Sequence, residues 1–469
     1  MKTYKIKRNK IKENKIKANK FKKNNLKECL LVLLSMGALA GCTRYTPLKS
    51  PSAVELEFSA EHLTVQETME HAEAETADVM ERAVSGAKEQ ELSATQETRA
   101  GNLRTSPGML QLTDDDETML SGRTPVKVKG IYISAYVAGN EAMMDNIIKQ
   151  IDKTELNAVV IDFKTDEGHI AAKVNSPVFQ EIAACRDYIP NLSVLMKKLK
   201  EHNIYTIARV VAFKDPYLAE RKPEWCLKTA DGSVYRDKKG LAWVSPYRKE
   251  VWDYLVEVGS QAGKAGFDEV QFDYIRFATD STMKQVVFDE AEAQGRSKTD
   301  IITEFTEYAS EKLTEQGLFV SADVFGAIIG SEEDANAVGQ IYGDMASHMD
   351  YICPMIYPSH YGDGNFGLDH PDLHPYETIL GALQDSREDL SRYDASGGQA
   401  IVRPWLQDFT ASYLKHYIPY RDEELRLQIQ AVYDAGYEEW ILWNAANKYH
   451  YGGLMDEEST EAGGEIPAF

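Results

Sequence analysis

Two aspartates, Asp273 and Asp323, have the surroundings expected of reactive groups. Asp273 lies in the segment Phe-Asp-Tyr-Ile-Arg-Phe at 272–277, and Asp323 lies in Ser-Ala-Asp-Val-Phe at 321–325. Each ends an apolar run typical of a β-strand. If the two runs are neighbouring parallel strands, their carboxyl groups lie roughly 5–6 Å apart. That spacing suits retaining cleavage of a glycosidic bond, in which one carboxylate is the nucleophile and the other is the acid/base.

The surroundings of the two aspartates suggest different roles. Asp273 is expected to be the nucleophile, neutralised by Arg209 or Arg276. Asp323 is expected to be the general acid/base, because apolar neighbours disfavour its charged form. The structural alternative is that either aspartate is a buried barrel residue paired with Arg209, Arg276 or Arg403.

Further polar and aromatic residues lie near the ends of predicted strands. Asp162 could bind a sugar hydroxyl or act as a catalytic partner, and its structural alternative is an ion pair with Lys164. Aromatic rings stack on the C–H faces of sugars, while amides and carboxylates bind the hydroxyls. The predicted substrate contacts are Asp162, Tyr132, Arg209, Arg276, Tyr357, Trp405, Gln407, Trp443 and Asn444.

An alternation of strands and helices must position these residues. The eight predicted strands are 128–134, 158–164, 204–213, 269–277, 318–324, 351–357, 400–407 and 440–444. The predicted helices are 142–153, 192–202, 249–264, 301–316, 339–348, 376–391 and 423–435. This pattern predicts an α/β fold with a parallel sheet. An open doubly wound sheet fits the alternation too, but no GxGxxG follows the first strand, and eight units favour a (β/α)₈ TIM barrel.

The period of two along each strand predicts which side chains point inward. Glu269, Gln271 and Asp273 share one face, whereas Val270 and Phe272 share the other. Because the helix-facing side should be apolar, the polar side is expected inside the barrel. The same parity places three further sets inward, namely Ser321 with Asp323, Tyr205 with Arg209, and Arg403 with Trp405 and Gln407.

The sequence resembles a bacterial family of glycoside-hydrolase barrels that was originally grouped as a domain of unknown function. The resemblance covers about 128–453 and rests on the segments 128–134, 159–164, 207–211, 272–277, 351–358 and 440–444. It implies a TIM barrel with glycosidase activity and a nucleophile at Asp273. Many relatives have Glu where this sequence has Asp323, so the resemblance supports Asp273 more strongly than Asp323.

Two long loops and the cysteines complete the barrel region. The segment 213–247, with Trp225 and Trp243, is expected to fold over the site. The segment 358–375 holds three His and three Asp, but their spacing matches no zinc motif, so we expect a substrate-contacting loop, no metal and no cofactor. Cys185, Cys226 and Cys353 are too few for a disulfide framework and are expected to be buried thiols.

The N-terminal part has a different composition. Residues 1–41 hold 12 Lys and Arg and run into 12 mostly apolar residues at 29–40, too short to span a bilayer. The segment Leu-Ala-Gly-Cys at 39–42 resembles a lipobox, so we expect a lipoprotein signal at 1–42 and lipidation of Cys42. Residues 43–125 are expected to be a flexible, disordered acidic linker, or alternatively a small helical interaction module. The barrel is expected at 126–453, followed by a tail at 454–469.

The overall charge excludes some partners. The chain has 469 residues, with 74 acidic and 52 basic side chains and a net charge of −22, which argues against a nucleic-acid partner. We therefore expect a glycoside hydrolase anchored by lipid to the outer face of a cell membrane, acting on a poly- or oligosaccharide. The long Lys-rich start favours a Gram-positive bacterium. The alternatives are a non-catalytic carbohydrate-binding barrel and a cell-wall scaffold.

The lipid anchor is tested by replacing Cys42. The parent should incorporate a diacylglyceryl label and partition into membranes, whereas Cys42→Ala should do neither, because the modified thiol is gone. Cys29→Ala is the matched control and should label like the parent. Labelling and membrane fractionation measure both properties. A Cys42→Ala protein that still carries the label would contradict the prediction.

Overall fold

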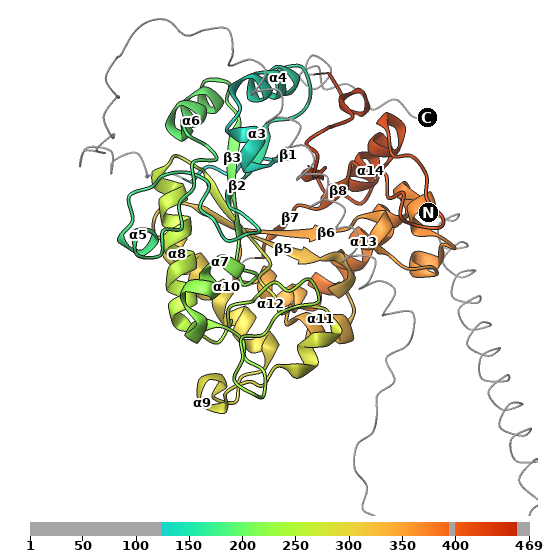
Figure 1. The fold of residues 1–469 in the computed structure, drawn as a ribbon. Helices are drawn as coiled ribbons and strands as arrows, with labels where there is room; N and C mark the ends of the chain where they lie inside the picture. Colours follow the sequence, from blue (N-terminus) through green and yellow to red (C-terminus); the bar gives the residue numbers. More distant parts are fainter. Residues whose placement is uncertain (1–122, 394–398, 457–469) are drawn as a thin grey trace, which may run out of the picture. The chain divides into compact units, whose positions relative to one another are not determined.

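A closed parallel barrel forms the centre of the computed structural model, which describes residues 123–393 and 399–456 (Figure 1). Its strands are β1 (Lys129–Ile133), β2 (Ala158–Lys164), β3 (Tyr205–Val211), β4 (Glu269–Asp273), β5 (Phe319–Phe325), β6 (Tyr351–Met355), β7 (Ile401–Val402), β8 (Trp405–Gln407) and β9 (Trp440–Trp443). Strands β1 to β6 pair in sequence order, and β9 pairs with both β8 and β1, which closes the ring. The predicted α/β barrel is confirmed.

The seventh position of the barrel differs from the prediction of one strand over 400–407. It is divided into β7 and β8, which both pair with β6. Pro404 lies at the division and has no N–H to donate to a neighbouring strand. Its carbonyl still accepts from the N–H of Ile441 at 2.9 Å, so the barrel remains closed there.

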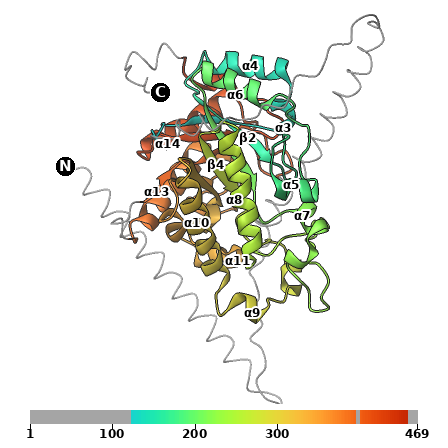
Figure 2. The ribbon, with the colours of Figure 1, turned by 90° about the vertical axis from the view of Figure 1, so that its left-hand side faces the viewer.

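Helices cover the outside of the strands. The longer ones are α4 (Glu141–Ile151), α6 (Leu192–Glu201), α8 (Lys249–Lys264), α10 (Lys298–Thr314), α13 (Pro375–Leu390) and α14 (Asp422–Asp434). The shorter ones are α3 (Ala135–Ala138), α5 (Pro177–Ile182), α7 (Pro216–Arg221), α9 (Glu290–Ala293), α11 (Glu332–Val338) and α12 (Tyr342–Ala346). Figure 2 shows α8 and α10 side by side. Ser297 and Asp300 form a capping box that begins α10.

Two details of the helical layer differ from the sequence pattern. The helix expected over 339–348 is the shorter α12, because Gly339, with φ of +84°, ends α11 just before it. After β9, the described residues contain only the short 3₁₀ helix η9 (Tyr451–Gly453), and Asp456 then forms a bridge with Thr154. Within the described ranges, no helix is long and apolar enough to cross a bilayer.

The interior of the barrel is lined by the side chains that the period of two placed there. The inner apolar cluster includes Val160, Ile207, Cys353 and Ile441, whereas Phe272 packs outward against Phe305 of α10 at 5.4 Å between ring centroids. Polar side chains join this interior. Gln271 donates to the Cys353 sulfur at 3.3 Å, and Tyr205 donates to Glu269 at 3.1 Å. The predicted inward parity of the polar strand residues is confirmed.

A buried ion-pair cluster crosses the barrel at the level of Glu269. Arg403 donates to both oxygens of Glu269, at 2.8 and 3.0 Å, and to Glu439 at 2.8 Å. Its guanidinium also lies 3.7 Å from the ring centroid of Tyr351. Ser321 donates a further hydrogen bond to Glu269. Arg403 therefore serves the packing of the barrel at a level below Trp405 and Asp323.

Three further predictions concern a long loop, the cysteines and the two ends of the chain. The loop 213–247 folds back on itself through antiparallel bridges, and its Trp243 packs against Tyr274 at 6.0 Å. Cys226 and Cys353 are buried free thiols, whereas Cys185 is half-buried. The predicted leader at 1–42, with Cys42, lies outside the described residues, as do most of the linker at 43–125 and most of the tail at 454–469.

The buried cluster makes a stability prediction. Arg403→Met leaves the carboxylates of Glu269 and Glu439 without their cation, so it should lower the free energy of unfolding by about 3–5 kcal/mol. Lys127→Met is the matched control, since its ion pair with Glu438 is exposed and should contribute about 0–1 kcal/mol. Denaturant unfolding followed by circular dichroism measures both. Equal small losses for the two variants would show that Arg403 is not needed for stability.

Candidate active site

Four charged residues meet at the carboxyl ends of four neighbouring strands. Asp162 is on β2, Arg209 on β3, Asp273 on β4 and Asp323 on β5, and all four are buried. Asp162 is paired in register with Arg209, and Phe272 with Ala322. One residue further along β4 and β5, Asp273 and Asp323 therefore stand at the same level. The barrel thus brings both predicted catalytic aspartates to one end.

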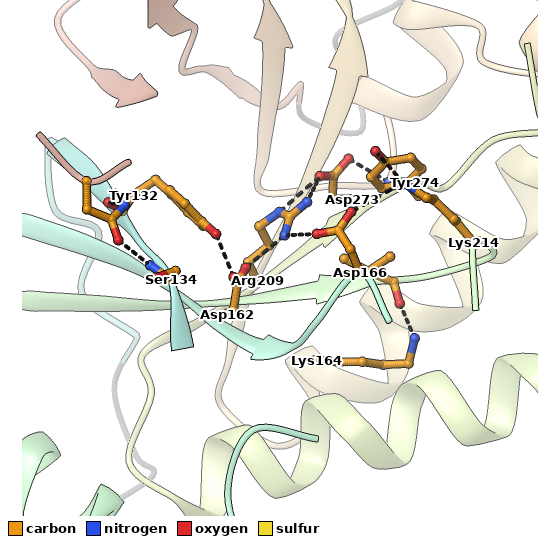
Figure 3. Close-up of polar contacts among 11 residues, drawn as sticks. Tyr132, Ser134, Asp162, Lys164, Asp166, Arg209, Lys214, Asp273 and Tyr274 are labelled. Carbon is orange, nitrogen blue, oxygen red and sulfur yellow. Dashed lines mark hydrogen bonds and ion pairs between the residues drawn. The ribbon is translucent and has the colours of Figure 1, made fainter. Parts of the chain in front are cut away.

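Arg209 is the central cation of this group. Its Nε and Nη2 both donate to Oδ2 of Asp273, at 3.0 and 2.6 Å. Its Nη1 donates to Asp162 at 2.8 Å and to Asp166 at 3.1 Å (Figure 3). Only 2% of Arg209 is exposed, so these contacts occur largely away from water. One guanidinium therefore binds three carboxylates from two strands and a turn.

The backbone after Asp273 is held in an uncommon conformation. Tyr274 has a φ angle of +52°, which lies in the left-handed region. This conformation costs free energy for a residue other than glycine. In this conformation the N–H of Tyr274 donates to Oδ1 of Asp273 at 2.6 Å. The hydroxyl of Tyr274 accepts from Lys214 at 3.0 Å, and Trp243 packs on its ring. The strained residue thus fixes the orientation of the Asp273 carboxyl group.

Asp323 lies in a different electrostatic environment from Asp273. Its Oδ1 accepts a hydrogen bond from the neutral indole of Trp405 at 2.7 Å. Burial raises the pKa of the Asp323 carboxyl well above its ordinary value, and the nearby charge of Asp273 raises that pKa further. Asp323 therefore favours the protonated form, while Asp273 is ion-paired with Arg209. This is the division expected of a proton donor and a nucleophile.

Asp162 and Asp166 complete the carboxylate group. Tyr132 donates to Asp162 at 2.6 Å. Burial raises the pKa of Asp162 to about 6, although Arg209 and Tyr132 act in the opposite direction. Against the cost of burial, Arg209 and Lys214 lower the pKa of Asp166 to about 2. The alternative pairing of Asp162 with Lys164 is not what the structure shows, because Lys164 forms its ion pair with Asp215 at 2.9 Å.

Several predicted substrate contacts surround the carboxylates. The rings of Tyr132 and Trp443 lie 4.3 Å apart, and Trp443 packs edge-on against Trp405 at 5.7 Å. Tyr357 belongs to the same buried cluster as Tyr132 and Trp405, and the charges of Asp323 and Asp273 add to burial in raising the pKa of its phenol. Arg209 stands 5.7 Å from the ring centroid of Trp443. These aromatic residues share the end of the barrel with the four charged residues.

Other predicted contacts have mainly structural partners. The amide of Gln407 donates to Asp372 and to the Phe409 carbonyl, both at 3.1 Å, and accepts from the N–H of Ser359. Asn444 donates to the carbonyls of Asp408 and Lys448 and accepts from the N–H of Ala446.

Arg276 packs against aromatic rings beside the site. It packs 4.3 Å from the ring centroid of Phe325 and 4.7 Å from that of Tyr274. The cation that is seen to bind Asp273 comes from Arg209 on the neighbouring strand.

Asp166 and Lys214 both belong to the group, although neither was among the site residues predicted from the sequence. Each lies just beyond a strand, Asp166 after β2 and Lys214 after β3. A charged residue within three positions of a strand end would have been the available signal. In the loop 358–375, His370 bonds to Asp363 at 2.8 Å and stacks on His416 at 3.9 Å. Among the described residues, no group of three or more His, Cys, Asp or Glu side chains is arranged to hold a metal ion.

Known proteins similar to this chain include glycosidases. The family described as "Putative glycosyl hydrolase domain" matches residues 130–449. A hypothetical protein from Ruminiclostridium thermocellum ATCC 27405 is 38% identical over 41% of this chain and 97% of its own, with a TM-score of 0.39. The PgaB (BpsB) glycoside hydrolase domain from Bordetella bronchiseptica is 12% identical over 68% of this chain and 94% of its own, with a TM-score of 0.45.

A third solved structure is an alpha-galactosidase from Thermus thermophilus, which is 14% identical over 73% of this chain and 61% of its own, with a TM-score of 0.42. No match is found among the curated proteins.

The central role of Arg209 makes a pH-dependent stability prediction. Arg209→Met should lower the free energy of unfolding by about 3–5 kcal/mol near neutral pH, because three carboxylates lose their cation. The loss should be smaller at pH 5 than at pH 8. Asp162 already has a pKa of about 6, above that of an unfolded aspartate, and losing the cation raises it further. The variant therefore gains relative stability as the pH falls and Asp162 takes up a proton.

Denaturant unfolding at the two pH values measures this difference. Lys173→Met is the control, since Lys173 and Asp187 form an exposed pair that should contribute little at either pH. The same loss for Arg209→Met at pH 5 and pH 8 would contradict the prediction.

Proposed function

The chain belongs to the family of putative glycosyl hydrolase domains, and we propose that it hydrolyses a poly- or oligosaccharide with Asp273 as nucleophile and Asp323 as general acid/base. The observation that carries this proposal is the contrast between the two aspartates. They stand level on neighbouring strands, yet one is ion-paired and the other is buried beside a neutral donor. Two carboxyl groups held in different protonation states are what hydrolysis of a glycosidic bond requires.

The mechanism that fits this arrangement retains the configuration of the sugar. Neighbouring strands are about 4.8 Å apart, close to the separation of about 5–5.5 Å that retaining glycosidases use. Asp273 attacks the anomeric carbon while Asp323 transfers its proton to the departing glycosidic oxygen. A glycosyl ester on Asp273 results. Asp323, now ionised, takes a proton from water, which attacks the ester and restores both groups.

Arg209 and Tyr274 support the nucleophile in this mechanism. The cation of Arg209 neutralises Asp273 before the sugar arrives, and the N–H of Tyr274 fixes the other oxygen of its carboxyl group. Trp405 orients Asp323 through its indole N–H. The half-buried Trp443 supplies aromatic surface beside these groups, suited to the C–H face of a sugar ring, and the buried Tyr132 packs against it at 4.3 Å.

A second candidate function is binding of carbohydrate without hydrolysis. The observation that favours it is that both oxygens of Asp273 already accept hydrogen bonds, two from Arg209 and one from Tyr274. These bonds reduce the electron density available for attack on a sugar. The aromatic residues at the same end of the barrel would serve binding alone equally well. Assays of the two aspartate variants separate these functions.

The proposed location is the outer surface of a bacterial cell membrane, with a cell-wall or environmental glycan as substrate. The support is the basic and apolar leader at 1–41 followed by Cys42. A lipid on Cys42 would tether the barrel through the acidic segment 43–125.

The division of roles is tested with activated aryl glycosides of the sugar that the parent cleaves. Such leaving groups need little protonation, so Asp323→Ala should keep much of its glycosylation rate, whereas Asp273→Ala should lose nearly all activity. On glycosides with a poor leaving group, Asp323→Ala should lose about 10²–10⁴-fold in kcat. Azide should accelerate turnover by Asp323→Ala and give a glycosyl azide of retained configuration, because it intercepts the ester on Asp273.

Asp152→Asn is the control, since Asp152 caps α4 and should not affect hydrolysis. Identical behaviour of the two alanine variants, or azide rescue of Asp162→Ala instead of Asp323→Ala, would contradict the assigned roles. An inactive parent that binds the glycan would favour the binding function.

A further inference from the structure

A group of aromatic side chains in tilted and edge-on contact lies outside the carboxylate group. Tyr136 on α3 and Tyr188, in the segment before α6, have ring centroids 4.7 Å apart. Tyr188 also bonds to Nδ1 of His169 at 3.1 Å, and His169 packs on Tyr217 of α7 at 4.6 Å. Tyr136 is 42% exposed, Tyr188 and His169 are half-buried, and Tyr217 is buried. The three members that are at least partly exposed, Tyr136, Tyr188 and His169, are called the aromatic platform below.

The chain joins this platform directly to the carboxylate group. Tyr132 bonds to Asp162 (Figure 3) and is followed along the chain by Ser134, which caps α3, and then by Tyr136 on that helix. Asp166, which bonds to Arg209, lies in a turn closed by the hydrogen bond from the N–H of Thr165 to the carbonyl of His169. Three Cα–Cα steps of 3.8 Å keep His169 within about 11 Å of Asp166. The platform therefore flanks the β1 and β2 side of the site.

The platform is also held in place by its surroundings. Ser134 caps α3, and its own N–H donates to Asn447 at 3.0 Å. Gly139 ends α3 so close to the next segment that a Cβ there would lie 1.8 Å from the carbonyl oxygen of Tyr188. The absence of a side chain at Gly139 thus allows α3 to pack directly on the backbone of Tyr188. This packing of α3 on the segment of Tyr188 holds the rings of Tyr136 and Tyr188 beside each other.

We propose that this aromatic platform binds an additional pyranose ring of the polysaccharide, beyond the ring whose bond is cleaved; the inference rests on the proposed function. Single exposed aromatic residues are ordinary, but here three rings in tilted and edge-on contact lie in segments that directly follow the strands of the carboxylate group. Aromatic faces accept the C–H face of a pyranose, and the phenol of Tyr136 can bond to its hydroxyls. The enzyme would then prefer chains of several sugars to short glycosides.

Binding of oligosaccharides by calorimetry tests the platform. The probes are the hexasaccharides and disaccharides of β-1,4-linked glucose, N-acetylglucosamine, xylose and mannose. An Asp323→Asn background preserves the shape of the site while removing its proton donor. Tyr136→Ala and Tyr188→Ala should each bind the preferred hexasaccharide about 3- to 10-fold more weakly. The loss should be smaller for the disaccharide, which occupies fewer sugar positions.

Two controls separate stacking from a general loss of structure. Tyr136→Phe keeps the ring and should bind the hexasaccharide nearly as well as the parent. Tyr308→Ala removes a partly exposed tyrosine that bonds to Asp253 between α8 and α10, and it should leave binding unchanged. Unaltered binding by Tyr136→Ala and Tyr188→Ala, equal losses for both probe lengths, or a parent that binds none of the hexasaccharides would overturn the proposal.

Hydrolysis is assayed separately with the same sugars in the parent background. If Asp273→Ala abolishes hydrolysis but the platform variants bind hexasaccharide normally, the platform proposal is wrong and the proposed glycosidase function is supported. If the parent binds hexasaccharide through Tyr136 but hydrolyses none of the sugars, the proposed glycosidase function is wrong and the platform proposal is supported.

Discussion

The buried guanidinium of Arg209 is the interaction on which the candidate site depends. Asp162, Asp166 and Asp273 would repel one another if they were gathered without a cation, and burial would add the cost of desolvating each charge. Arg209 has donors enough to bind all three, and its planar fork directs them to β2, to the turn after β2 and to β4. A lysine would carry the same charge on a single ammonium group, without the planar set of donors that reaches all three carboxylates. The parallel register of β2, β3 and β4 is what brings these groups within hydrogen-bonding distance.

The same cation creates the difference between Asp273 and Asp323. It contacts the first directly, whereas the second is buried and accepts its hydrogen bond from Trp405. The negative charge of Asp273 then raises the pKa of Asp323 in addition to burial. A nucleophile and a proton donor of the same residue type thus become distinct through their neighbours. The left-handed conformation of Tyr274 holds the carboxyl group of Asp273 in place, at a cost in backbone free energy. Packing of Trp243, in the loop 213–247, against the Tyr274 ring helps to maintain this conformation.

Aromatic residues gather at the same end of the barrel as the carboxylates. Tyr132, Trp443 and Trp405 form a connected set of rings beside the carboxylates, and the platform of Tyr136, Tyr188 and His169 continues outward from the β1 and β2 side. The first set lies on strands, with Tyr132 and Trp405 buried and Trp443 half-buried, so it is suited to one enclosed sugar ring. The platform lies on a short helix and on loops and is partly open to solvent. A binding surface that is enclosed near the carboxylates and open to solvent further out suits a chain of sugars rather than a single sugar.

The sequence alone determined the barrel, its inward-facing residues and the two aspartates, because strand alternation and the period of two are local properties of the chain. It could not choose between Arg209, Arg276 and Arg403 as the partner of Asp273, since all three are arginines close to predicted strand ends. The barrel shows that Arg209 reaches Asp273, whereas Arg403 lies at the level of Glu269. The structure likewise paired Lys164 with Asp215, added Asp166 and Lys214, and divided one strand at Pro404. The physical reason is that the height of a side chain in a closed barrel depends on the register of all the neighbouring strands, which no single segment of sequence contains.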